Sequence, residues 1–498
     1  MFLNKNNNNK LLAQLFNNAV VKKKNNSNSN NNNIISDKYL NTKPIPECPR
    51  PGIFESIKSL VNYDKAMKLH EIVDNKHREL GPIYKDHIGP VTAFFLNSPE
   101  DYRKIFKNEG PMPMHFLPEA WLIYNNFRKC SRGLLFMNGE EWLNFRRIIN
   151  KLLLQPYDAK SIVINSCQDA AVTLTEECKK LKNGCVIPEL ETRLYKWSIE
   201  VMMASLLGSA WNKYRDTIAD GESDKLAENL HKIFELTARL SLLPVKYVVK
   251  FNLPVWRRFV QVVDEVLELV GTLVPKMIKY QGDGLLSLML NEGMSEQDVT
   301  RIVTDLILAA GDTTAFSTQW ALFLLGSNED VQNKFAEISS NLELEETIKN
   351  PYIKGIIKES LRLYPTAPFL TRILPDDCLV SGHLVPRGEL IIMSLYSSGR
   401  DPNNFSRPNE FLPERWIRNT KGSYDDLLNP FATIPFALGV RSCVGRKIAE
   451  TQMIMTLSEL VKNFKINCLN KENIKLKLHM ISVPSEPIKL QLTQRIRV

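Results

Sequence analysis

The sequence predicts a mainly α-helical fold with small β-sheets. Helical periodicity dominates from residue 55 onward, and the interruptions between helical segments are short. Strand-like segments are few and occur near Val91–Leu96, Leu379–Val385 and Leu390–Ser394. The chain has 498 residues, of which 44% are hydrophobic, so it can bury a large core. Length alone would allow two or three domains, but no internal repeat is evident.

Residues 1–36 form an Asn-rich leader with five lysines and no Asp, Glu or Arg. Apolar residues recur at helical spacing from Leu11 to Val20. A basic, amphipathic segment without acidic residues is typical of a mitochondrial targeting peptide, although such peptides usually contain arginine. A disordered, low-complexity tail is the alternative. Residues 37–52 are rich in proline and predict a stiff segment leading into the folded body at residues 53–498.

Composition excludes several classes of protein. The net charge is +9, and five of the positive charges belong to the leader, so the body has too small an excess to indicate binding to nucleic acid. The eight cysteines are scattered without a C-x-x-C pair, which indicates neither a disulfide framework nor a zinc site. The sequence contains no run of about twenty apolar residues, so no transmembrane helix is expected.

One ten-residue segment contains the most specific pattern in the chain. Its spacing is Phe436-x-x-Gly439-x-Arg441-x-Cys443-x-Gly445, and a helical pattern follows directly. A helix N-terminus favours negative charge, so this position should lower the pKa of the Cys443 thiol. The two glycines allow tight turning and close approach of the backbone to a ligand. Taken alone, Cys443 would be a buried structural cysteine, but the spacing around it argues for a ligand.

This spacing resembles the haem-ligand loop of the cytochrome P450 monooxygenases, and the resemblance extends over roughly residues 40–498. It implies a single-domain fold that holds haem b between a long central helix and the helix after Cys443. Cys443 would be the axial thiolate ligand of the iron, which favours cleavage of dioxygen. Phe436 would shield the sulfur from water, and Arg441 would pair with a haem propionate.

Three further residues are expected at the propionates. Trp142 and Arg146 stand at i and i+4 on one face of a predicted helix. In the family such a pair donates hydrogen bonds to a propionate, whereas the alternative is a core tryptophan beside a surface arginine. Arg372 lies where the family uses an arginine for a propionate.

A long helix is predicted over residues 295–325. Ser295 and Asp298 resemble a capping box at its start. Near its middle, the segment Ala309–Thr314 resembles the oxygen-activation motif of the family, although Ala310 replaces the usual glycine. The resemblance implies that Thr313 holds an oxygen intermediate by a hydrogen bond and that Asp312 relays protons. The alternative is a group of polar residues at a helix kink.

Glu359 and Arg362 form an E-x-x-R pattern on a predicted helix. In the family this pair joins a third residue, which corresponds to Arg415 within Pro413-Glu414-Arg415-Trp416. The resemblance implies that these three residues brace the core beside the haem loop and are structural rather than catalytic.

Four basic residues predict the electron donor. Lys354 and Lys358, just ahead of the E-x-x-R arginine, resemble the mitochondrial branch of the family, and Arg446 and Lys447 after the cysteine would extend the same basic face. In that branch such lysines bind an acidic ferredoxin that is reduced by an NADPH-dependent reductase. The alternative is an ordinary solvated lysine face. Electrostatic docking of this kind would make turnover sensitive to salt.

The segment Leu240–Trp256 is apolar with a few lysines. It falls where the family has a lid over the substrate site, which can lie in a membrane interface and admit lipophilic substrates. An ordinary core helix is the alternative.

Three longer stretches indicate the substrate. The segments Leu117–Asn125, Arg132–Trp142 and Ala310–Trp320 are similar to the arthropod ecdysteroid 2-hydroxylases of the mitochondrial branch. This likeness implies hydroxylation of a 2-deoxyecdysteroid at carbon 2, in moulting-hormone synthesis, on the matrix side of the inner mitochondrial membrane. The alternatives are another sterol, a secosteroid or a xenobiotic as substrate, or a haem sensor or carrier without oxygenase activity. Asp312 and Thr313 argue against a pure binder, which needs no proton relay.

Overall fold

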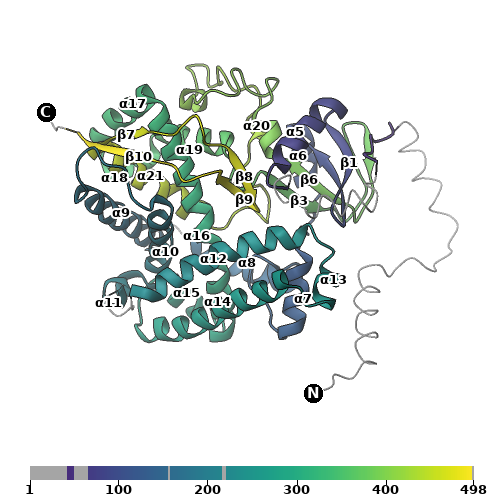
Figure 1. The fold of residues 1–498 in the computed structure, drawn as a ribbon, viewed down its shortest axis with the longest axis horizontal. Coiled ribbons are helices and arrows are strands. Elements are labelled where there is room, and N and C mark those ends of the chain that lie inside the picture. Colours follow the sequence, from purple (N-terminus) through teal and green to yellow (C-terminus); the bar gives the residue numbers. More distant parts are fainter. Residues whose placement is uncertain (1–41, 50–65, 155–157, 216–219, 496–498) are drawn as a thin grey trace.

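The computed structural model describes residues 42–49, 66–154, 158–215 and 220–495. A four-stranded sheet with its neighbouring helices lies at one end of the molecule, and helices make up most of the rest (Figure 1). The mainly α-helical fold with small sheets is therefore confirmed. The leader at residues 1–36 lies outside the described residues.

The helices have the following bounds: α5 Leu69–Leu80, α6 Pro99–Lys107, α7 Glu119–Arg128, α8 Glu140–Leu154, α9 Asp158–Lys179, α10 Leu190–Leu207, α11 Trp211–Arg215, α12 Asp220–Ser241, α13 Val245–Lys250, α14 Pro254–Lys279, α15 Leu285–Asn291, α16 Glu296–Ser327, α17 Glu329–Ser340, α18 Leu344–Lys349, α19 Pro351–Leu363, α20 Leu395–Gly399 and α21 Arg446–Asn463. Short 3-10 helices lie at Gly208–Ala210, Pro413–Trp416 and Pro430–Ala432.

The strands are β1 Ile83–Ile88, β2 Val91–Leu96, β3 Phe369–Ile373, β4 Cys378–Val380, β5 His383–Val385, β6 Leu390–Ser394, β7 Phe464–Cys468, β8 Leu476–His479, β9 Ile481–Pro484 and β10 Leu490–Gln494. The large sheet has the order β1-β2-β6-β3, in which only β2 and β6 are parallel. The other three sheets are two-stranded and pair β7 with β10, β4 with β5 and β8 with β9.

Two of the predicted strands, Val91–Leu96 and Leu390–Ser394, are confirmed with the same bounds. The third, Leu379–Val385, is wrong as a single strand. Ser381 and Gly382 both have positive φ and form the two-residue turn of a hairpin between β4 and β5. The remaining strands were not predicted, although β7 and β10 alternate between buried and less buried residues as half-buried strands do.

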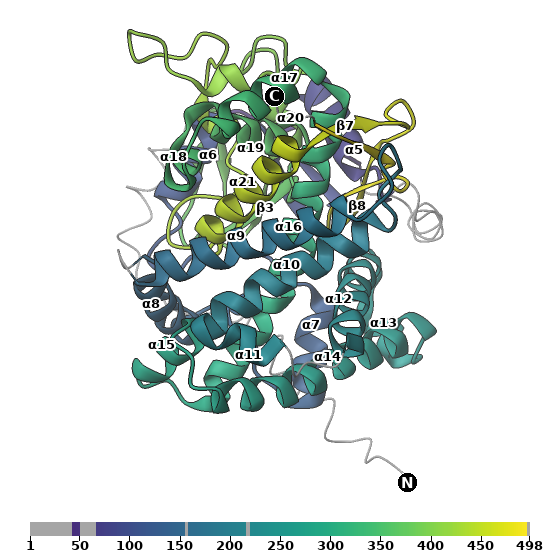
Figure 2. The ribbon, with the colours of Figure 1, turned by 90° about the vertical axis from the view of Figure 1, so that its left-hand side faces the viewer.

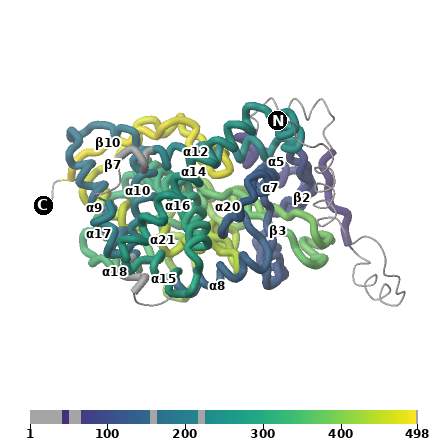
Figure 3. Tube along the Cα trace, turned by 90° about the horizontal axis from the view of Figure 1, so that it is seen from below, coloured from purple at the N-terminus to yellow at the C-terminus, as the bar shows by residue number. Residues whose placement is uncertain are grey.

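Helix α16 passes through the middle of the helical part. In Figure 3 it lies among α10, α14 and α21, and it packs against all three. Figure 2 shows α9 and α10 crossing one face of the molecule, with α21 beside α9. Most of α16 from Val299 to Leu325 is buried, as is most of α10, so both helices belong to the core.

The start of α16 is close to the prediction. The Ser295 side chain caps the helix by accepting a hydrogen bond from the N–H of Asp298. The reciprocal half of the predicted capping box is not formed. Instead, the Asp298 carboxylate accepts hydrogen bonds from the Ser295 hydroxyl and from Arg301. The shorter aspartate side chain therefore binds the cap side chain rather than the cap backbone.

The segment Leu240–Trp256 combines the two alternatives considered for it. It contains the end of α12, all of α13 and the first turn of α14, and Val245, Val248 and Trp256 are buried. Tyr247, Phe251 and Leu253 are exposed by 61%, 65% and 41%. One side of the segment therefore belongs to the core, while the other presents apolar side chains to solvent.

Part of the proline-rich segment is described. Residues 42–49 lie along the edge of the large sheet, where the Cys48 N–H donates to the Lys85 carbonyl and the Lys85 N–H donates to the Pro46 carbonyl. The Lys43 N–H reaches the carbonyl of Gly382 in the β4–β5 turn. These contacts cover the otherwise free edge of β1.

Candidate functional site

The loop that contains Cys443 is held in a compact turn before α21. The Cys443 N–H donates to the Phe436 carbonyl at 2.8 Å, and the Ser442 N–H donates to the Gly439 carbonyl at 3.2 Å. Gly439 has a φ of +75°, and a Cβ at this position would collide with the carboxylate of Glu109. Glycine is therefore required at 439 for two reasons. Gly445 has an ordinary φ of −83° and no protein atom near its missing Cβ, so the protein itself imposes no such requirement there.

Cys443 lies on the wall of a cavity of about 940 Å³ that is open to solvent. In the protein without a metal ion, opposing effects act on the pKa of this thiol. Burial among the surrounding loop and helix atoms raises the pKa above its ordinary value, although the Gly445 N–H and the charges of Arg146 and Arg446 lower it in part. The helix begins three residues after the sulfur, which weakens its effect. A metal ion that binds the sulfur would remove the proton outright.

Three arginines, Arg146, Arg372 and Arg441, come together beside this loop, and we call them the guanidinium cluster. Arg146, from α8, donates to the carbonyl of Ser442. Arg372, from β3, donates to the Glu109 carboxylate at 2.6 Å. Glu109 is itself in contact with Gly439, so the cluster joins α8, β3 and the cysteine loop.

Arg441 is the most heavily contacted member of the guanidinium cluster. Its guanidinium lies 3.9 Å from the centre of the Trp142 ring and donates to the carbonyls of Pro113 and Met137. Burial, followed by the positive charges of Arg372 and Arg146, lowers its pKa to about 9. The cluster thus has more positive charge than its one carboxylate, Glu109, balances.

The donors in this cluster fit a ligand with carboxylate groups. Two buried nitrogens, Nε of Arg146 and Nη2 of Arg372, have no hydrogen-bond partner among the described residues. Buried guanidinium groups without partners are costly, and an anion that accepts their hydrogen bonds removes that cost. Haem, with two propionates and an iron that binds thiolate, matches both the guanidinium cluster and Cys443.

Phe436 contributes to the cysteine loop through its backbone and its ring. Its carbonyl accepts the Cys443 N–H, and its partly buried ring carries the Arg446 guanidinium 5.4 Å from the ring centre. The ring therefore lies at the junction of the loop with α21.

Asp312 and Thr313 lie in the middle of α16 with different surroundings. The Thr313 hydroxyl donates to the Ala309 carbonyl one turn earlier, at 2.6 Å. The Asp312 side chain is fully buried, and neither of its oxygens accepts a hydrogen bond from a described residue. The nearest basic group is Nδ1 of His231 on α12, at 3.6 Å from Oδ2. A buried carboxylate without partners is typical of a functional residue rather than of a structural one.

Residues of α10 contact Ala310 and Gly311, which precede Asp312 on α16. The Ser198 hydroxyl donates to the Ala310 carbonyl at 2.8 Å. A Cβ at Gly311 would lie 2.8 Å from the phenolic oxygen of Tyr195, so Gly311 makes room for that ring. Ala310 stands where the family usually has glycine, and the next residue, Gly311, lets α10 pack closely against α16.

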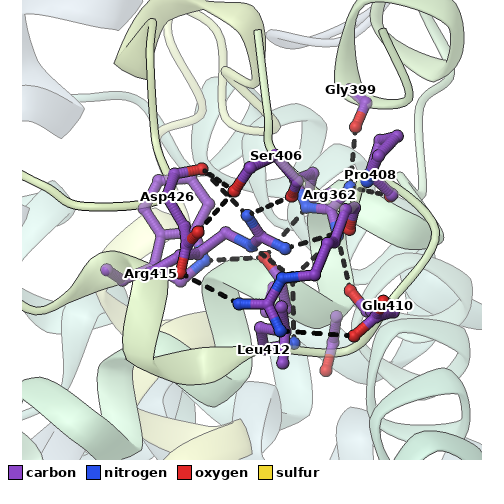
Figure 4. Close-up of polar contacts among 12 residues, drawn as sticks. Arg362, Gly399, Ser406, Pro408, Glu410, Leu412, Arg415 and Asp426 are labelled. Carbon is purple, nitrogen blue, oxygen red and sulfur yellow. Dashed lines mark hydrogen bonds and ion pairs between the residues drawn. The ribbon is translucent and has the colours of Figure 1, made fainter. Parts of the chain in front are cut away.

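Glu359 and Arg362 of α19 form a closed network with Arg415 of the 3-10 helix Pro413–Trp416. Figure 4 shows Arg362 and Arg415 among the backbone groups that surround them. The Glu359 carboxylate accepts from Arg362 at 2.7 and 2.9 Å and from Arg415 at 2.8 Å. The remaining guanidinium donors reach backbone carbonyls, which include Gly399 and Glu410 for Arg362 and Ser406, Arg407 and Asp426 for Arg415. This arrangement ties α19 to the loops that precede the cysteine.

Four predicted docking residues, Lys354, Lys358, Arg446 and Lys447, line the cavity beside Cys443. We call them the basic rim. Within the described residues, Lys354 and Lys447 are exposed and make no ion pair, whereas Arg446 pairs with Glu450 at 3.1 Å. Lys358 lies 5.4 Å from the centre of the Trp416 ring. The structure therefore gathers residues that are about ninety positions apart in the chain around one opening.

Three residues of the site were not identified from the sequence: Glu109, His115 and His231. His115 contacts Arg441 and the Asn138 side chain, and burial, with the charges of Arg441 and Arg372, lowers its pKa to about 4. Each of the three stands alone in the sequence without a motif around it. Only their spatial contacts reveal them.

The chain is similar to known proteins over most of its length. The model of the family described as Cytochrome P450 matches residues 46–492. "Cytochrome P450 315a1, mitochondrial" of Drosophila melanogaster is 34% identical over 93% of this chain and 90% of its own length. "Cholesterol side-chain cleavage enzyme, mitochondrial" of Oncorhynchus mykiss is 28% identical over 91% of this chain and 90% of its own length.

A solved structure has the same fold. "Retinoic acid bound cyanobacterial CYP120A1" superimposes with a TM-score of 0.73 and 19% identity, over 91% of this chain and all of that one. At this level of identity the likeness supports the fold alone.

Proposed function

The chain belongs to the cytochrome P450 family, and from this we propose that it is a mitochondrial steroid hydroxylase that takes its electrons from a ferredoxin. The monooxygenase class follows from the family. The proposed substrate is a 2-deoxyecdysteroid, hydroxylated at carbon 2 during ecdysteroid synthesis. The proposed place is the matrix side of the inner mitochondrial membrane.

We assign a separate role to each group of residues in the site. Thiolate-ligated haem supplies, when bound, the cleavage of dioxygen and the insertion of one oxygen atom into substrate. Cys443 would bind the iron, while the guanidinium cluster and Trp142 would hold and orient the propionate side. Thr313 would offer its hydroxyl on the substrate side of α16, and Asp312 would hold a proton one residue away.

The basic rim is the main support for a ferredoxin as the electron donor. Its four cations surround the opening beside Cys443, so an acidic protein that docks there would lie near the iron ligand. Long-range attraction between opposite charges speeds docking and weakens with salt. Two relatives are named as mitochondrial proteins, which supports the same donor class.

A lipophilic substrate is supported by the surface of the α12–α13–α14 segment. Its exposed Tyr247, Phe251 and Leu253 lie beside Lys246 and Lys250, a combination that suits the headgroup region of a bilayer. In the described part of the chain, no helix has both the length and the apolar character needed to cross a membrane. Peripheral contact is therefore the proposed mode of association.

The proposed substrate rests on likeness alone. The stretches around Trp121, Trp142 and Trp320 resemble ecdysteroid 2-hydroxylases, and the name of the Oncorhynchus mykiss relative identifies a sterol as its substrate. Another sterol is the alternative that must be tested beside it.

The test begins with the purified haem protein. Its reduced carbon monoxide complex should show the strongly red-shifted Soret band of thiolate ligation, and Cys443→Ser should lose it. The protein is then supplied with NADPH, ferredoxin reductase, mitochondrial ferredoxin and a panel of 2-deoxyecdysteroids, other sterols and xenobiotics. The expected product is the 2-hydroxylated ecdysteroid, identified by mass spectrometry and NMR.

The outcomes separate the parts of the proposal. Turnover of another sterol alone would overturn the ecdysteroid assignment and keep the steroid class. Turnover supported by a microsomal flavoprotein reductase but not by ferredoxin would overturn the mitochondrial donor. A matched reaction without ferredoxin controls for background oxidation.

A further inference from the structure

Asp312 is a buried carboxylate whose oxygens lack hydrogen-bond partners among the described residues. Such a group is costly unless something nearby compensates it. His231 is the basic side chain that faces it, with 3.6 Å between Nδ1 and Oδ2. That nitrogen is also buried and also lacks a hydrogen-bond partner. The two unsatisfied groups therefore face each other across the boundary between α12 and α16.

The position of His231 is set by the opposite face of α12. Thr237 accepts a hydrogen bond from the Trp121 indole of α7 at 3.1 Å, and Asn229 donates to Glu265 of α14 at 3.0 Å. At 100° per residue, both anchors lie on the far side of the helix from His231. Packing on α7 and α14 thus directs the histidine towards α16.

The ring of His231 lies between the buried Asp312 and the solvent. Its side chain is 32% exposed, whereas that of Asp312 is 0% exposed. Its ring centre lies 5.8 Å from that of Phe316 and 6.3 Å from that of His479 on β8. One side of the imidazole therefore faces the carboxylate, while part of the ring remains accessible to water.

Acidic groups dominate the surroundings of His231. Burial lowers the pKa of His231, but Asp312 from α16, Glu191 from α10 and Glu235 from α12 together raise it above its ordinary value. The other titratable neighbours are Tyr195 and His479. Burial, together with the charge of Asp312, keeps the pKa of Tyr195 well above its usual range, so the phenol stays neutral, and burial lowers the pKa of His479. His231 is therefore the histidine of this group whose pKa is shifted in favour of the protonated form, whereas that of His479 is shifted the other way.

We propose that His231 is a positioning residue that holds Asp312 in place and passes it protons from solvent. In each transfer the Nδ1–H bond of the imidazolium breaks and an O–H bond forms on Oδ2 of Asp312. Both side chains become neutral, and the imidazole then regains a proton from water. The proposal rests on the proton-holding role proposed above for Asp312.

The first experiment measures the pKa of His231 directly. NMR of the diamagnetic, reduced carbon monoxide complex with labelled histidine gives seven ring signals, one for each histidine in the chain, and His231→Gln assigns the one of interest. The wild-type pKa should lie above 6.5, and Asp312→Asn should lower it by about one unit or more. An unchanged pKa in Asp312→Asn would overturn the pairing. This comparison needs no substrate, so it decides the inference even if the proposed steroid is not turned over.

The second experiment follows oxygen use against pH with a substrate that the enzyme accepts. In the wild type, the ratio of product to oxygen consumed should fall as pH rises through the pKa of His231, because the imidazolium is the donor. His231→Gln should lower this ratio about tenfold or more and remove that pH dependence. His479→Gln is the matched control and should keep the wild-type profile.

Two results would contradict the proton role. One is a His231→Gln enzyme with wild-type coupling. The other is an enzyme that loses product but keeps the wild-type pH dependence, because a merely structural defect would behave in that way. The Soret band of the carbon monoxide complex shows in each case that the variant has folded and bound haem.

Discussion

The Glu359–Arg362–Arg415 network and the guanidinium cluster are both buried and both charged, but they differ in how fully their donors are used. In the network, one carboxylate binds two guanidinium groups, and the remaining donors reach backbone carbonyls. None of its side-chain nitrogens or oxygens is without a partner among the described residues. In the guanidinium cluster, Arg146 and Arg372 each leave a buried nitrogen unpaired.

This difference separates a structural site from a binding site. A charged network that is satisfied by the protein itself stabilises the fold whether or not a ligand is present. A cluster with excess positive charge and unpaired donors reaches its lowest energy only with an anionic ligand. Three changes test this contrast, and a fourth tests the exposed charges of the basic rim.

The largest effect is expected in the network. Glu359→Gln should lower the free energy of unfolding by about 3–5 kcal/mol, because two buried guanidinium groups lose their shared carboxylate. Urea unfolding followed by circular dichroism measures this change with and without haem. Glu414→Gln, at an exposed position nearby, is the control and should change stability by less than about 1 kcal/mol. A small effect of Glu359→Gln would show that the network is not a structural brace.

The guanidinium cluster should show the opposite behaviour. Arg146→Gln should leave the stability of the haem-free protein nearly unchanged, because the lost hydrogen bond to Ser442 is offset by the removal of one of three crowded charges and of an unpaired buried nitrogen. Haem binding should weaken by about 1.5–3 kcal/mol, the value of a hydrogen bond to a charged group. Transfer of haem to apomyoglobin measures the loss. Arg147→Gln, exposed on the same helix, is the control, and equal haem affinity in both variants would contradict the assignment of Arg146.

Acid should affect the cluster through His115. Its folded-state pKa of about 4 lies below its ordinary value, so the unfolded chain binds the proton more tightly and stability falls as pH decreases from 6.5 towards 4. Between pH 7 and pH 5 this histidine accounts for about 2 kcal/mol. His115→Gln should remove that part of the acid sensitivity of the haem-free protein, as measured by urea unfolding at the two pH values. An unaltered difference between pH 7 and pH 5 would refute this role of His115.

The smallest effect is expected at the basic rim, where the charges are exposed. Lys354→Gln should reduce ferredoxin-supported turnover about threefold at low salt and less at high salt, because docking loses one attractive charge. Stopped-flow reduction at several salt concentrations measures this effect, and Lys279→Gln on α14 is the control. Equal rates for Lys354→Gln and the wild type at low salt would place the docking surface elsewhere.

Elements that depend on residues close together in the chain were predicted correctly from the sequence. The helix that follows Cys443, the start of α16 and the strands β2 and β6 depend on local periodicity and capping, so they were predicted closely. The β4–β5 turn was missed although the Ser381-Gly382 dipeptide is a local turn signal, because the apolar residues on both sides suggested one continuous strand. The desolvation that raises the pKa of the metal-free Cys443 thiol was not foreseen, because it depends on chain segments that are distant in sequence.

The sequence by itself determined the helical class, the cysteine loop and the E-x-x-R helix, since each is written in residues a few positions apart. Only the tertiary structure decided that Glu109 and His115 join the arginines, and that His231 faces Asp312. Those contacts join α12 to α16, and β3 to the loops that hold Glu109 and Cys443. The physical reason is that pairing, desolvation and charge balance depend on distance in space, and a single side chain without a local motif carries no trace of its distant partner.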